Sequence, residues 1–247
     1  MLNQFNVLFQ KGIMSLKTEG IRYTFHKCLN YKRKINLQNV STQKDWCIED
    51  LLNQKFRSSQ PISIIETINL EKRVNIVTDS IDKDSLFGGV ATSLIIATEF
   101  ANKYNIPLRV ITRTTPANPI AYYNIMEISE VKAARHISFY SYYDRDLKGR
   151  KNFKLETSKN DIFIATSWWS ALAIRKTFPE MHFFYVLQEV ETFFYPHGDE
   201  HYWCSQMMED TNITYIVNSQ LLFEYFKNNN ENVFANGVFF EPAFPAI

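Results

Sequence analysis

The sequence has 247 residues, of which 45% are apolar and 15% aromatic, a content that can bury a full hydrophobic core and excludes an intrinsically disordered chain. The net charge is +1, but residues 1–40 carry seven lysines and arginines against Glu19 alone, so the basic character belongs to the N-terminal segment. Because no long apolar run predicts a transmembrane helix and the start lacks the order of a secretory signal, we expect a cytoplasmic protein.

Residues 1–70 are expected to form a basic helical extension. Apolar and basic side chains recur at helical spacing between residues 13 and 34. Such a segment either packs on the main domain as a solvated arm, or lets residues 1–40 lie peripherally on the inner face of the cytoplasmic membrane. Because Gly12 and Gly20 interrupt the pattern, the solvated arm is the favoured interpretation.

From residue 73 onward, short β-branched or aromatic runs alternate with helical patterns. A strand at 73–79, a helix at 89–104 and a strand at 108–113 form a βαβ unit. Further strands are predicted at 136–140, 161–166, 182–188 and 214–218, and helices near 118–130, 168–177, 199–209 and 219–227. The pattern predicts an α/β fold over residues 71–240, a Rossmann-like parallel sheet with helices on both faces.

In such a sheet the functional loops follow the carboxyl ends of the strands. The predicted site therefore gathers after Thr78, Arg113, Thr166 and Gln188. The first of these loops leads to Gly88 and Gly89 at the start of a helix, where free backbone N–H groups either bind an anion or only complete a turn. A dinucleotide site is not predicted, because the GxGxxG pattern is absent.

Three segments resemble the WsaF-type rhamnosyltransferases and related glycosyltransferases of the rhamnan and O-antigen kind. They are VNIVTDSIDKDSLFGGVATSLIIAT, DIFIATSWWSALAI and FFYVLQEVETFFYPHGDEHYW, and the resemblance covers about residues 70–245. Members of this class have a GT-B fold, in which two Rossmann-like domains face each other across a cleft. The resemblance implies that this chain is the N-terminal half, which mainly holds the acceptor sugar, while a C-terminal domain holds the nucleotide-sugar donor.

The resemblance also implies roles for the first loops. Gly88 and Gly89 would approach the donor diphosphate, where backbone N–H groups could stabilise the developing charge. Asp79, at the end of the first strand, and Arg113, at the end of the second, are expected to shape the loops there. Arg113, in the proline-fixed stretch TRTTPANP, either contacts an anionic acceptor group or only solvates the end of a strand.

The pair Trp168 and Trp169 follows a predicted strand and is a candidate aromatic platform for a sugar ring. Adjacent residues on a helix point about 100° apart, so one tryptophan can face the cleft while the other enters the core. Ser167 is predicted to be the N-cap of this helix.

The loop after residues 182–188 concentrates polar and aromatic side chains where a plain connector does not need them. The candidates for binding acceptor hydroxyls are Gln188, Glu189, Tyr195 and His197. The competing interpretation is structural, with Pro196 and Gly198 forming a turn, Asp199 capping the next helix and the histidine serving only in packing.

Neither a metal site nor a disulfide framework is predicted. Cys28, Cys47 and Cys204 lie far apart without paired spacing. His197 and His201 are four residues apart, but HGDEH lacks the HExxH order of a zinc-binding helix.

The resemblance implies a retaining transfer of L-rhamnose from dTDP-L-rhamnose to a growing bacterial cell-surface polysaccharide. No cofactor, metal or nucleic-acid partner is expected, and no catalytic residue is assigned, since positioning and stabilisation of the departing diphosphate carry the reaction. The family's paired-glutamate motif is absent, and residues 241–247 resemble the start of a linker to a donor domain. The chain alone is therefore expected to be incomplete for catalysis.

Two interpretations from other classes stay open. One is a non-catalytic module that binds a glycan or a partner glycosyltransferase through its aromatic loops. The other is a membrane adaptor built on residues 1–40, whose liposome binding would vanish in high salt.

Overall fold

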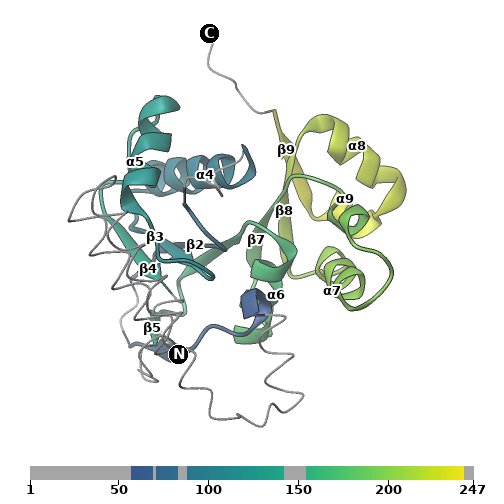
Figure 1. The fold of residues 1–247 in the computed structure, drawn as a ribbon, viewed down its shortest axis with the longest axis horizontal. Helices are drawn as coiled ribbons and strands as arrows, with labels where there is room; N and C mark the ends of the chain where they lie inside the picture. Colours follow the sequence, from purple (N-terminus) through teal and green to yellow (C-terminus); the bar gives the residue numbers. More distant parts are fainter. Residues whose placement is uncertain (1–56, 69–70, 83–87, 142–153, 242–247) are drawn as a thin grey trace, which may run out of the picture. The chain divides into compact units, whose positions relative to one another are not determined.

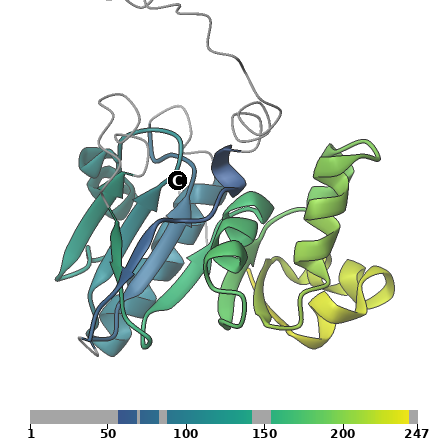
Figure 2. The same ribbon diagram turned by 90° about the horizontal axis from the view of Figure 1, so that it is seen from below.

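A computed structural model describes residues 57–68, 71–82, 88–141 and 154–241. Its centre is a sheet of seven parallel strands in the order β4-β3-β2-β6-β7-β8-β9 (Figure 1). The strands are β2 (Val74–Thr78), β3 (Leu108–Thr112), β4 (Ile137–Ser141), β6 (Ile162–Ala165), β7 (Phe183–Leu187), β8 (Ile213–Asn218) and β9 (Gly237–Phe240). Figure 2 shows the teal β4 edge and the yellow β9 edge at opposite ends of this sheet.

Helices follow the strands and lie on both faces of the sheet (Figure 1). They are α4 (Gly88–Tyr104), α5 (Pro119–Ile128), α6 (Trp168–Thr177), α7 (Asp199–Met208), α8 (Gln220–Asn229) and α9 (Glu231–Ala235). Among the described helices, none is long and apolar enough to cross a membrane. The predicted α/β fold, a parallel sheet with helices on both faces, is confirmed.

Two hydrophobic clusters hold the layers together, one on each face. Leu94 of α4 and Tyr122 of α5 pack with strand residues such as Ile76 on one face. On the other face, residues of α6 and α7 pack with strand residues such as Val77. Because successive strand residues point to opposite faces, all five residues of VNIVT and of LRVIT are buried, and three of the five in each strand are apolar.

The chain reverses direction across the sheet between β2 and β6. From β2 it moves outward through β3 to β4, and from β6 it moves the opposite way through β7 and β8 to β9. Parallel pairing joins β2 to β6 at the centre, with Ile76 opposite Ile164. The connections leave this point in opposite directions, which opens a crevice at the carboxyl ends of the strands.

Several short elements were not predicted. Strand β1 (Ile64–Glu66) pairs in parallel with β5 (Leu155–Thr157) in a separate two-stranded sheet, and a 3-10 helix, η1 (Arg57–Ser59), precedes β1. These elements belong to the compact unit Leu52–Ile247 that contains the main sheet. The described end of the predicted extension is thus a turn and a strand, while residues 1–56 and the linker residues 242–247 lie outside the described residues.

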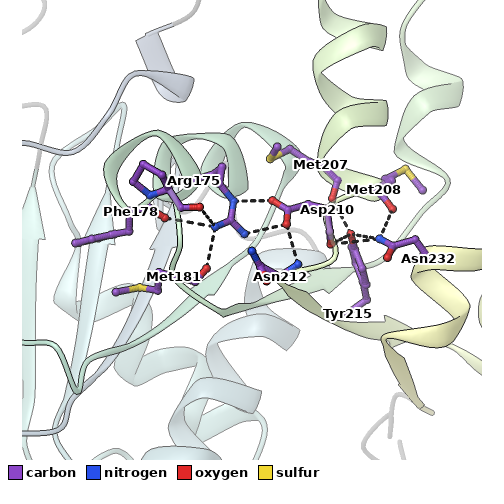
Figure 3. A network of polar contacts seen from close by, with 10 residues as sticks. Arg175, Phe178, Met181, Met207, Met208, Asp210, Asn212, Tyr215 and Asn232 are labelled. Carbon is purple, nitrogen blue, oxygen red and sulfur yellow. Dashed lines mark hydrogen bonds and ion pairs between the residues drawn. The ribbon is translucent and has the colours of Figure 1, made fainter.

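A polar network joins α6, α7, β8 and α9 near the residues that precede β7 and β8 (Figure 3). The guanidinium of Arg175 binds both carboxylate oxygens of Asp210, at 2.6 and 2.9 Å. The hydroxyl of Tyr215 donates to the Met207 carbonyl at 2.8 Å, and Asn232 donates to the same hydroxyl at 3.1 Å. Since these groups come from four elements, the network fixes their relative positions.

Candidate functional site

A pocket of about 400 Å³ opens at the central crevice, at the carboxyl ends of β2, β6 and β7. Its position agrees with the rule that ligands bind where a doubly wound sheet reverses its strand order. The lining comes from four segments: Thr78, Asp79 and Ser80 at the end of β2, Gly89 and Val90 at the start of α4, Thr166, Ser167 and Trp169 after β6, and Gln188, Glu189, Glu191, Phe194 and Tyr195 after β7.

Most of the residues selected from the sequence meet in this pocket. The lining includes Asp79, Gly89, Trp169, Gln188, Glu189 and Tyr195, and Gly88 is the first residue of α4 beside it. Trp168, Arg113 and His197 do not line it. No lysine, arginine or histidine is among the described lining residues, whereas Asp79, Glu189 and Glu191 are acids.

The two adjacent tryptophans occupy different environments. Trp168 is only 3% exposed and belongs to the core cluster, while Trp169 is half-buried and lines the pocket. Their rings meet edge to face with centroids 5.4 Å apart. Ser167 caps α6, since its hydroxyl accepts the Ser170 N–H while the Ser170 hydroxyl accepts the Ser167 N–H. Trp169 is therefore the tryptophan available to a ligand.

The aromatic wall continues through the loop after β7. Phe194 is 65% exposed and Tyr195 is half-buried, and both line the pocket. Tyr195 packs edge to face on the buried Trp168 with centroids 5.6 Å apart, so a core residue supports it from behind. An aromatic wall beside carboxylates suits a sugar, whose C–H face packs on rings while its hydroxyls bind polar groups.

Gln188 uses its side-chain amide to join β7 to α4. Its Nε2 donates to the Gly89 carbonyl at 2.6 Å and to the Ser93 hydroxyl at 3.2 Å. A Cβ added to Gly89 would lie 2.6 Å from the Gln188 Oε1. The absence of a side chain at Gly89 therefore lets Gln188 fix the first turn of α4, a role that differs from the predicted contact with an acceptor.

We expect the effect of Gly89→Ala on the free energy of unfolding to change sign when Gln188 is removed. Gly89→Ala should destabilise the wild-type chain because the methyl group displaces the Gln188 amide. In a Gln188→Ala background it should instead stabilise α4 by up to about 1 kcal/mol, the usual helical preference of alanine over glycine. Urea unfolding of the four chains in this double-mutant cycle measures the coupling, and additive effects would contradict the contact.

Asp79 and Arg113 hold the ends of β2 and β3 together. The Asp79 carbonyl accepts the backbone N–H groups of Arg113 and Thr114, at 3.0 and 2.9 Å. Burial raises the pKa of the Asp79 carboxyl above its ordinary value, and the opposing effects of Ser58, Trp169 and Arg113 are smaller. Asp79 thus holds the loop through its main chain and is one of the residues that line the pocket.

Arg113 does not contact the pocket, contrary to its predicted role with an anionic acceptor group. Its side chain is fully buried, and its guanidinium donates to the Ser58 carbonyl at 3.3 Å and to the Gln60 carbonyl. The alternative that it solvates the end of a strand is also wrong. Arg113 instead ties the η1 segment to β3.

His197 is exposed and lies outside the lining, with its ring 4.6 Å from that of His201. The His201 Nδ1 lies 3.1 Å from the Tyr195 carbonyl, so this histidine contacts the aromatic loop. Helix α7 begins at Asp199 with Gly198 as its N-cap, so the predicted cap at Asp199 is wrong by one residue.

Glu191 is a lining residue that the sequence analysis missed. It begins the 3-10 helix η3 (Glu191–Phe194), and its Oε2 accepts the backbone N–H of Trp168 at 3.0 Å. Burial, the largest cause, raises the pKa of the Glu191 carboxyl to about 7, with Glu189 adding to the effect and Tyr185 and Trp168 opposing it. The sequence feature that could have identified Glu191 is an acidic residue within the mainly apolar segment VETFF.

A family model described as "WsaF, N-terminal domain" matches residues 73–220, which is more than half of the chain. The match runs from β2 to the start of α8 and includes every residue of the pocket lining. A search among curated proteins found no match.

Proposed function

The chain belongs to the WsaF N-terminal domain family, and on this premise we propose that it forms the acceptor-side half of a retaining GT-B glycosyltransferase. The proposed reaction transfers a sugar, L-rhamnose from dTDP-L-rhamnose, to a hydroxyl group of a growing bacterial cell-surface polysaccharide. The family is of the glycosyltransferase type, and the donor, the acceptor and the stereochemistry belong to the proposal.

One observation carries this proposal: the pocket at the strand reversal combines an aromatic wall with carboxylates. Trp169, Phe194 and Tyr195 offer apolar rings, while Glu189 and Glu191 offer hydrogen-bond acceptors. Sugar hydroxyls are donors that suit carboxylates, and the apolar face of a pyranose suits aromatic rings. The pocket volume of about 400 Å³ is large enough for a sugar residue and open enough for a chain to extend from it.

In the proposed mechanism, the role of this half of the enzyme is to position the acceptor. The aromatic wall and the carboxylates would hold the acceptor with one hydroxyl toward the donor. Because the two reactants would then already be oriented, the entropic cost of bringing them together would be lower in the reaction step. Gly88 and Gly89 begin α4 and Gly89 lines the pocket, so backbone N–H groups and the positive potential of this helix terminus would favour the departing diphosphate. The donor itself would be held mainly by a second domain.

Replacement of Trp169 by alanine tests the acceptor site. We expect the affinity for neutral methyl glycosides to fall about tenfold or more, because the ring that packs on the sugar is lost. Ligand-observed NMR titration of the full 247-residue chain measures the affinity. Trp203→Ala is the matched control, since Trp203 is 36% exposed on α7 and does not line the pocket. If both variants lose the same affinity for the glycosides, the aromatic wall does not bind the sugar.

A second candidate function is a binding module without catalysis. Exposed aromatic residues outside the pocket favour it, above all Phe193, which is 74% exposed beside the pocket residue Phe194. Such a surface suits a partner protein as well as a glycan. A radiolabelled sugar-transfer assay with dTDP-L-rhamnose on protein isolated from its native cells separates the two functions, because the module binds saccharide without transferring rhamnose.

A further inference from the structure

Glu191 lines the pocket, and contacts within the protein hold its carboxyl group in place. Its Oε2 accepts the Trp168 N–H at 3.0 Å, at the first residue of α6. The side chain lies in the wall with Trp169, Phe194 and Tyr195. The carboxyl group therefore stands beside the aromatic surface on which a sugar ring would pack.

The fold does not require an acid at this position. The N-terminus of α6 has a complete capping box, formed by Ser167 and Ser170 with hydrogen bonds of 3.3 and 3.0 Å. The hydrogen bond from Trp168 to Glu191 could equally be accepted by a neutral amide oxygen. Withdrawal of a carboxylate from water is costly, and the hydrogen bonds of Glu191 to the Trp168 N–H and the Tyr185 side chain could be kept by a neutral amide at lower cost.

The titratable groups that face Glu191 supply no positive charge. They are Tyr185 on β7, Glu189 and Tyr195 in the loop, and Cys204 on α7. Burial raises the pKa of Tyr185 and of Cys204, which keeps both neutral at physiological pH. Among the described residues around it, Glu191 therefore lacks a cationic partner, and its carboxylate has capacity to accept hydrogen bonds from a ligand.

We propose that Glu191 binds the acceptor directly, accepting a hydrogen bond from a hydroxyl of the sugar that packs on Trp169, Phe194 and Tyr195. This inference rests on the proposed acceptor function and adds a residue and a selectivity to it. A carboxylate attracts hydroxyl donors and repels carboxylate or phosphate groups, so the site selects neutral sugar units at this position.

The ionised carboxylate is the better acceptor of a hydroxyl hydrogen bond. Because burial raises the pKa of Glu191 to about 7, the group loses its proton between pH 6 and pH 8. The affinity for a neutral sugar is therefore expected to rise over this interval. Replacement by glutamine keeps the shape and an acceptor oxygen but removes the ionisation.

The test compares the full chain with its Glu191→Gln and Glu209→Gln variants. Glu209 is an exposed acid at the end of α7 and lies outside the pocket. Methyl glycosides of L-rhamnose, D-mannose, D-glucose and D-galactose are titrated at pH 6 and pH 8 by ligand-observed NMR. We expect Glu191→Gln to weaken binding about fivefold or more at pH 8 and by less at pH 6, whereas Glu209→Gln should match the wild type.

The outcomes separate the inference from the proposed function. If the wild type binds a glycoside and Glu191→Gln binds it equally well at pH 8, the inference is overturned while the acceptor function stands. If the wild-type affinity is the same at both pH values, the inference also fails, and this measurement needs no variant. If no glycoside binds the wild type at either pH, the acceptor function and the inference fall together.

Discussion

Replacement of Arg175 by methionine is expected to lower the free energy of unfolding by about 3–5 kcal/mol, the usual effect of breaking a buried ion pair. Arg175 and Asp210 are only 15% and 13% exposed, and two hydrogen bonds join them (Figure 3). The same guanidinium donates to the carbonyls of Pro179 at 2.7 Å and Met181 at 2.9 Å. Methionine would remove the guanidinium donors from these carbonyls and from a shielded carboxylate, which would keep the Asn212 N–H but lose its counter-charge.

Urea unfolding followed by circular dichroism measures the effect. Lys227→Met is the matched control, because Lys227 pairs with Glu224 at 3.8 Å on the surface, where both side chains are more than half exposed. Exposed pairs of this kind contribute well under about 1 kcal/mol. If the two substitutions lower the free energy of unfolding equally, the network around Asp210 stabilises the fold no more than an exposed ion pair does.

Glu191→Gln is expected to stabilise the protein at pH 8 by up to about 3 kcal/mol and to change little at pH 4.5. The folded chain raises the pKa of this carboxyl from 4.5 to about 7, so it binds the proton more tightly than the unfolded chain does. Stability contributed by this group is therefore lost as the pH rises from about 4.5 to about 7, and glutamine avoids that loss. Glu191 is only partly buried and lines the pocket, so contact with water keeps the gain below this limit.

Unfolding free energies of the wild type and Glu191→Gln, measured in urea across this pH range, give the difference directly. Glu209→Gln controls for the general change in net charge. A glutamine variant that is less stable than the wild type at pH 8 would contradict the burial argument. Together with the binding test, the expected result describes a residue whose removal strengthens the fold while it weakens the site.

The main elements could be predicted because their patterns are local. Helix α6 was predicted at 168–177 and is found there, since Ser167 caps its start and Pro179 soon follows its end. The central strands were found as short runs rich in β-branched and aromatic residues. Strands β1 and β5 were missed because three residues each carry too little pattern, and each exists only by pairing with the other, about 90 residues away.

The position of the site could be predicted for a different reason. A parallel sheet places the carboxyl ends of its strands together, so the loops after β2, β6 and β7 had to meet. The direction of individual side chains depends on contacts between distant segments. Arg113 turns toward carbonyls more than 50 residues earlier in the chain, and the burial of Glu191 depends on how η3 lies against α6.

The pocket draws its lining from loops and helix starts, while the two hydrophobic clusters draw mainly on strand interiors and inner helix faces. Sequence changes in the segment after β7 can therefore alter what the pocket recognises without a change in most of the residues that hold the sheet together. In the proposed function, this separation would let the preference for an acceptor change without a matching change in the fold. A graft of residues 188–198 between two members should move sugar preference with it while leaving the scaffold intact.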